Sequence, residues 1–171
     1  MMPLLASLEN SGFGTWVRES SSLWAYPTIL FMHTVGLGFL VGLNVAIDLR
    51  ILGVAEKLPL APFEKFYRVM WGAFWINALS GTALLVADAT TKLTNRVFYI
   101  KMVCIFFAVM SMVLIRRRAF GAVADRAAVA APARALAAMS LVLWAGAITA
   151  GRLMAYFGPV SGAPGLQNRL P

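Results

Sequence analysis

The sequence predicts an all-α integral membrane protein: a four-helix up-and-down bundle preceded by a short N-terminal amphipathic surface segment. Two properties of its 171 residues support this prediction, because 60% are hydrophobic and only 13% are charged. Soluble domains contain about 25% charged residues, so this chain has too few charges to cover a water-exposed surface. The composition therefore excludes a disordered chain, a soluble enzyme and a nucleic-acid-binding protein.

Four segments are long and apolar enough to cross the hydrocarbon core, which takes about 20 residues of helix. They cover residues 24–47, 69–87, 97–115 and 136–157, and together form one domain over 24–157. Each segment is flanked by charged residues, proline or glycine, and none of the connections could fold as a separate domain. Short connections favour antiparallel neighbours, which predicts the up-and-down bundle.

The remaining segments are short. Residues 1–23 contain two amphipathic stretches, Met1–Leu8 and Phe13–Val17, which we expect to lie on the outward-facing surface of the membrane. Residues 158–171 contain several prolines and glycines, so we expect an extended C-terminal tail there.

The distribution of positive charge predicts the orientation. Basic residues collect in the connections after the first and third spans: Arg50, Lys57, Lys65, Arg68, Arg116, Arg117, Arg118, Arg126 and Arg134. Because Lys and Arg mark the cytoplasmic side, both termini should lie outside, which is the periplasm for a bacterial inner membrane. The net charge of +8 then reflects membrane orientation and not nucleic-acid binding.

Ionisable groups within a bilayer are costly, so each one calls for a partner or a function. His33, Lys101 and Arg152 all fall inside predicted spans. At about 1.5 Å per residue, His33 and Asn77 lie roughly 13–15 Å below the outer edge, and the two cations roughly 6–8 Å below it. We therefore expect these four residues to share the outer half of the bundle.

This arrangement suits a flat apolar ligand with acidic groups at one end. Haem b has this form, with His33 as the iron ligand and Lys101 and Arg152 beside the propionates. A quinone is the second candidate, with His33 and Arg152 donating to its carbonyls. Because the chain holds one histidine, a sixth iron ligand would be a methionine, Lys101, a second copy's His33, or absent. Electron transfer would require a membrane or periplasmic redox partner, or a homo-oligomer.

A structural interpretation uses the same residues. Asn77 could hydrogen-bond His33 between helices, while Lys101 and Arg152 could extend to the membrane surface. The protein would then be a non-catalytic accessory subunit of a larger membrane complex. Asp48 is expected near the inner interface, paired with Arg68 or with the arginines at 116–118. A small-solute or metal transporter is disfavoured, because no acidic residue is expected at the membrane centre to bind a cation.

Several runs resemble a family of uncharacterised bacterial four-helix membrane proteins known only as a domain of unknown function. They are PTILFMHTVGLGFLVG, LNVAIDLRILG, FWINALSGTALLVADA, NRVFYIKM and SLVLWAGAITAGRLMAYFG. That resemblance implies no known activity. His33 and Lys101 are also distantly similar to the His and Lys of HemJ-type protoporphyrinogen oxidases and of CopD-type membrane domains. The first of these similarities implies haem. The chain lacks the further histidines and the Met-rich ligand sets expected for copper.

Overall fold

The computed structural model describes residues 2–120 and 131–157, which contain helices and no strand, so the predicted all-α class is confirmed. The helices are α1 (Met2–Glu9), α2 (Gly12–Glu19), α3 (Tyr26–Leu52), the 3-10 helix η1 (Ala61–Lys65), α4 (Phe66–Ala87), α5 (Ala89–Thr94), α6 (Arg96–Ala119) and α7 (Ala131–Phe157). The tail predicted over 158–171 lies outside the described residues.

Four helical segments are long and apolar enough to cross a membrane, so the chain is a multi-pass membrane protein. They are α3, η1 together with α4, α6, and α7 as far as Met154. Large apolar side chains cover their outward faces, where they can contact lipid: Phe31, Phe39, Trp75, Leu79, Phe106 and Val142 are all exposed. The helices run past the predicted spans, and α3 continues to Leu52 because Gly53, with a φ of 107°, is the first residue suited to end it.

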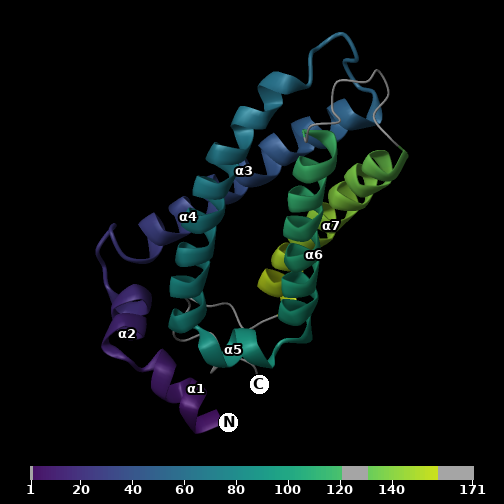
Figure 1. The fold of residues 1–171 in the computed structure, drawn as a ribbon. Helices are drawn as coiled ribbons and strands as arrows, with labels where there is room; N and C mark the ends of the chain where they lie inside the picture. The colour runs from purple at the N-terminus through teal and green to yellow at the C-terminus, as the bar shows by residue number, and fades with distance from the viewer. Residues whose placement is uncertain (1, 121–130, 158–171) are drawn as a thin grey trace.

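The bundle consists of two antiparallel helix pairs (Figure 1). Helix α3 packs on α4 and α6 packs on α7, while α3 also contacts α7 and so joins the pairs. Toward the end that carries α1, α2 and α5, here called the α5 end, helices α4 and α6 diverge and α5 bridges them (Figure 1). The opposite end, here called the η1 end, carries η1 and the arginines at 116–118.

The apolar core lies in the middle of the bundle and at the η1 end. Its largest members are Leu40, Ile47, Ile51, Tyr67, Met70, Met112, Ile115 and Trp144. In the α5 half, by contrast, α6 has no buried residue between Arg96 and Phe107, and α3 buries only Gly36 between Tyr26 and Phe39. Among the residues that the structure describes, the two helix pairs therefore share no closed core in the half predicted to face outward.

Helices α1 and α2 are fastened to the α5 end. Val17 of α2 is fully buried, and α2 packs on α4 while α1 packs on α5. The carboxylate of Glu9 accepts a hydrogen bond from the Thr90 backbone N–H at 3.1 Å and pairs with Arg18 at 3.3 Å. Arg18 also donates to the carbonyl oxygen of Ala87 at 3.4 Å. The predicted surface segment thus forms two helices attached to the bundle by polar contacts.

Acid should release α1 from the bundle. Burial raises the pKa of Glu9, but hydrogen bonds from Thr90 and the charge of Arg18 outweigh it, leaving the pKa below the ordinary 4.5. A carboxyl with a lowered pKa stabilises the folded state at neutral pH, and this contribution disappears as the pH falls through the lowered value. A spin label at exposed Ser7 should therefore gain mobility below pH 4.5. In Glu9→Gln the label should already be mobile at neutral pH; a label equally immobile in both proteins at every pH would contradict this.

Candidate functional site

The ring of His33 is held by α4 through one of its two nitrogens. Its Nδ1 lies 3.0 Å from the backbone oxygen of Asn77 and 3.2 Å from Ser80 Oγ. A carbonyl oxygen only accepts hydrogen bonds, and Ser80 donates its own proton to the Ile76 carbonyl at 2.6 Å. The contact with the carbonyl therefore favours the tautomer with the proton on Nδ1, which in the neutral ring leaves a lone pair on Nε2 for a ligand.

Asn77 returns a second hydrogen bond across the same helix pair. Its side-chain Nδ2 donates to the backbone oxygen of His33 at 2.7 Å. The structure therefore brings together the two residues placed at equal depth by sequence. The hydrogen bond expected between Asn77 and His33 is present, and each side chain bonds the other residue's backbone. This reciprocal pairing fixes the height of α3 against α4.

Two glycines allow the close approach that these bonds require. A Cβ on Gly81 would lie 2.9 Å from Cε1 of His33, so the imidazole packs directly on the backbone of α4. A Cβ on Gly36 would lie 3.1 Å from both the Ala73 oxygen and the Asn77 nitrogen. The orientation of the His33 ring thus depends on the absence of side chains at these two positions.

Lys101 and Arg152 lie on the other helix pair. Lys101 is half-buried on α6 and runs along Gly151 of α7, where Nζ is 3.7 Å from the position of an added Cβ. Arg152 follows Gly151 and is exposed. Within the described ranges, no hydrogen bond or ion pair joins these two cations to His33 or Asn77. The four predicted site residues therefore divide into two groups, one on each helix pair.

Lys92 is a candidate site residue that sequence reasoning missed, because residue 92 lies in the connection between the predicted spans 69–87 and 97–115. The short helix α5 directs it back toward the bundle, and its Nζ donates to the Leu84 carbonyl at 2.6 Å. Burial lowers the pKa of Lys92; the carboxylate of Asp88 opposes this shift, and the charge of Lys101 adds to it. A signal was present, since lysines often bond the last carbonyls of a helix.

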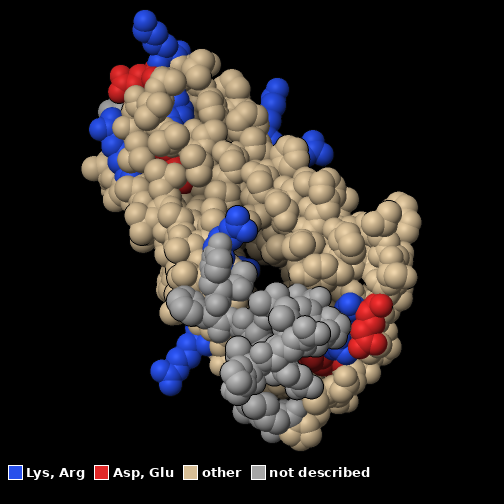
Figure 2. Space-filling model, turned by 180° about the vertical axis from the view of Figure 1, so that it is seen from behind, with Lys and Arg blue, Asp and Glu red and all other residues tan. Residues whose placement is uncertain are grey.

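A hollow lies between the diverging helix pairs, and Lys or Arg side-chain atoms border it (Figure 2). Among the described residues, no three His, Cys, Asp or Glu side chains come together, so the side chains alone do not form a metal-ion site there. A lone histidine suits a metal that arrives with its other ligands, as haem iron does in its porphyrin. Nearby cations suit the acidic groups of such a ligand.

The expectation for Asp48 was wrong. Its side chain is fully buried, and its Oδ2 accepts from Asn44 Nδ2 at 2.6 Å, while the same amide donates to Ser140 of α7 at 2.8 Å. Asp48 forms no ion pair within the described ranges, and Arg116 pairs with Glu64 at 3.8 Å instead. Because α3 does not end at residue 47, Asp48 stays on the face that packs against α7, away from the arginines.

No family model, curated protein or solved structure matches this chain. The resemblance to the uncharacterised four-helix family, and the distant similarity to the HemJ and CopD types, stay predictions.

Proposed function

We propose that the protein binds haem b in the hollow between the α3–α4 pair and the α6–α7 pair, and that it takes part in membrane electron transfer. The observation that carries this proposal is the hydrogen bond from His33 Nδ1 to the Asn77 carbonyl. Histidines that ligate metals usually donate their second ring N–H to a carbonyl or carboxylate, which fixes the tautomer and the ring orientation. His33 has this arrangement, with Nε2 left as the ligand atom.

The basic residues supply the complementary charge. Lys101 and Arg152 on the α6–α7 pair, together with Lys92 on α5, would bind the two propionates of haem. The half-exposed apolar residues of the diverging helices would cover its macrocycle. When bound, haem supplies one-electron redox chemistry, and this chain contributes binding, orientation and the polarity of the surroundings.

The tautomer of His33 favours haem over a quinone. A quinone carbonyl needs a hydrogen-bond donor, but the neutral imidazole already donates its proton to Asn77. Lys92, Lys101 and Arg152 remain as donors, so a quinone would bind away from His33. Quinone extracted in stoichiometric amount from purified protein without haem would replace the haem proposal.

The location of the site follows from the predicted orientation. If the arginine-rich η1 end is cytoplasmic, the hollow opens in the outer half, which is the periplasmic half in a bacterial inner membrane. The described loops are short, so electrons would pass to a membrane or periplasmic partner or to a second copy of the chain.

The visible spectrum of the protein purified in detergent tests this proposal. We expect a Soret band in the oxidised and reduced states, and its loss in His33→Ala. Thr34→Ala is the matched control, because Thr34 is an exposed neighbour whose hydroxyl bonds only its own helix, at Leu30. A protein that shows no Soret band after haem supplementation, or a band unchanged in His33→Ala, would overturn the proposal.

The accessory-subunit interpretation predicts a different outcome. The bonds between His33 and Asn77 would then serve only to join α3 to α4, as polar residues do between membrane helices. His33→Ala would lower stability in a colourless protein, and gentle extraction would yield a heavier complex by native mass measurement.

A further inference from the structure

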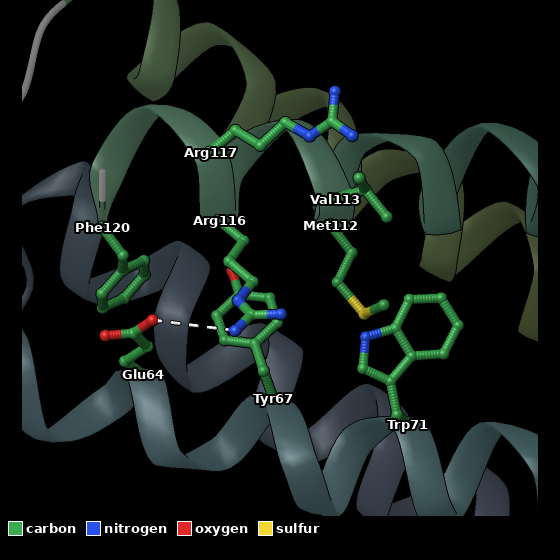
Figure 3. A pocket seen from close by; sticks show the side chains of 8 residues that line it. All are labelled: Glu64, Tyr67, Trp71, Met112, Val113, Arg116, Arg117 and Phe120. Atoms are coloured by element: carbon green, nitrogen blue, oxygen red, sulfur yellow. Dashed lines mark ion pairs between the residues drawn. The ribbon is translucent and has the colours of Figure 1, made fainter. Parts of the chain in front are cut away.

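A pocket of about 320 Å³ opens at the η1 end between α4 and α6 (Figure 3). It is independent of the proposed haem site, which lies in the other half of the bundle. Glu64 and Tyr67 line it from η1 and α4, and Arg116 and Arg117 line it from the last turns of α6.

The pocket changes from charged to apolar along the helices. Trp71 lies one helical turn beyond Tyr67 on α4, and Val113 lies one turn before Arg117 on α6. Both line the same pocket and are partly exposed. Both positions are farther from the helix ends and so deeper in the span. A glycerophospholipid has the same order of groups, with a charged phosphate at the surface and acyl chains below it.

Arg116 is held in place by two partners. Its Nη2 lies 3.8 Å from Glu64 Oε1, and its guanidinium lies 5.5 Å from the centre of the Tyr67 ring. Figure 3 shows Arg116 directed toward Glu64 and Tyr67, whereas Arg117 extends along α6 toward Val113. Because Glu64 balances the charge of Arg116, the charge of Arg117 is in excess in the pocket lining.

The surroundings add to this positive charge. Lys65, Arg68 and Arg118 are exposed near the same end of the bundle. An excess of cations attracts a lipid with a net negative charge more strongly than a zwitterionic lipid. Basic pockets between membrane helices on the cytoplasmic side suit anionic head groups.

We propose that this pocket binds one anionic phospholipid, whose phosphate contacts Arg116 and Arg117 and whose acyl chain lies along Trp71 and Val113. The arginines supply charge-assisted hydrogen bonds to the phosphate, and the planar guanidinium suits two of its oxygens at once. The apolar part of the lining distinguishes a lipid from free phosphate, which has no apolar group to place against Trp71 and Val113.

Native mass spectrometry of the full chain in detergent tests the proposal. The probes are phosphatidylglycerol and phosphatidylcholine with identical acyl chains, and we expect one phosphatidylglycerol to be retained preferentially. Arg117→Gln removes one charge-assisted contact, so its apparent affinity should fall about tenfold. Arg118→Gln is the matched control: it removes the same charge from the same run, but Arg118 does not line the pocket.

Three results would overturn the proposal. Equal losses in Arg117→Gln and Arg118→Gln would mean that general surface charge, and not the pocket, attracts the lipid. Equal retention of the two lipids would exclude selection for an anionic head group. Displacement of phosphatidylglycerol by excess inorganic phosphate would assign the site to phosphate alone. Because Arg117 is exposed, its substitution leaves the core intact, and an unchanged thermal transition would verify this.

Discussion

Replacing Gly36 by leucine is expected to separate α3 from α4 and to lower the free energy of unfolding by about 1–3 kcal/mol. A Cβ at this position would lie 3.1 Å from two backbone atoms, the Ala73 oxygen and the Asn77 nitrogen. Backbone atoms of a helix cannot rotate away as a side chain can, so the whole helix must move. Asn77 would then be drawn away from His33, and haem retention should fall as well.

Gly38 provides the matched control for this experiment. It lies two residues farther along α3, and a Cβ there would meet nothing within 4 Å. Gly38→Leu changes the same residue type in the same helix without a clash, so its unfolding should be close to that of the parent protein. Circular dichroism during denaturation in detergent compares the two variants. Equal destabilisation by both would mean that the α3–α4 contact is not the cause.

The fold could be predicted because length and apolar content decide which segments cross a membrane. The shared depth of His33 and Asn77 also followed from sequence, since each residue of a helix advances by a fixed rise. The rotation of each helix about its own axis could not be predicted from sequence, because apolar residues cover almost the whole circumference of each span. Sequence therefore could not show that Lys101 faces Gly151, or that Asn77 holds the His33 ring through its backbone oxygen.

The errors at Lys92 and Asp48 share a physical cause. Lys92 falls in a connection between two predicted spans and Asp48 at the end of one, and at both kinds of position side chains usually face water. Helix α5 instead returns Lys92 toward the bundle, and α3 carries Asp48 past the expected end into the core. A signal for Asp48 was present, because Asn44, Asp48 and Ile51 recur at intervals of four and three residues and so share one helix face.

Replacing Asp48 by alanine should lower the free energy of unfolding by about 2–3 kcal/mol, because it would leave buried polar groups unpaired and open a cavity. The Oδ2 of Asp48 accepts from Asn44, and the Asn44 amide also bonds Ser140, so the three side chains connect α3 to α7. The bond between Asn44 and Ser140 joins the two helix pairs. Asp48→Asn keeps an acceptor oxygen of nearly the same size and should recover most of the loss.

Denaturation of these variants, followed by circular dichroism, measures the effect, and Asp88→Ala is the control. Asp88 is half-buried at the α5 end, outside the α3–α7 interface. Asn44→Ala, Ser140→Ala and the double variant complete a cycle that isolates the energy of the hydrogen bond between α3 and α7. Polar contacts within membrane bundles couple by about 0.6 kcal/mol on average and about 1.7 at most. A coupling near zero would mean that the bond between Asn44 and Ser140 does not stabilise the bundle, and the junction of the two helix pairs would then rest on apolar packing around Trp144.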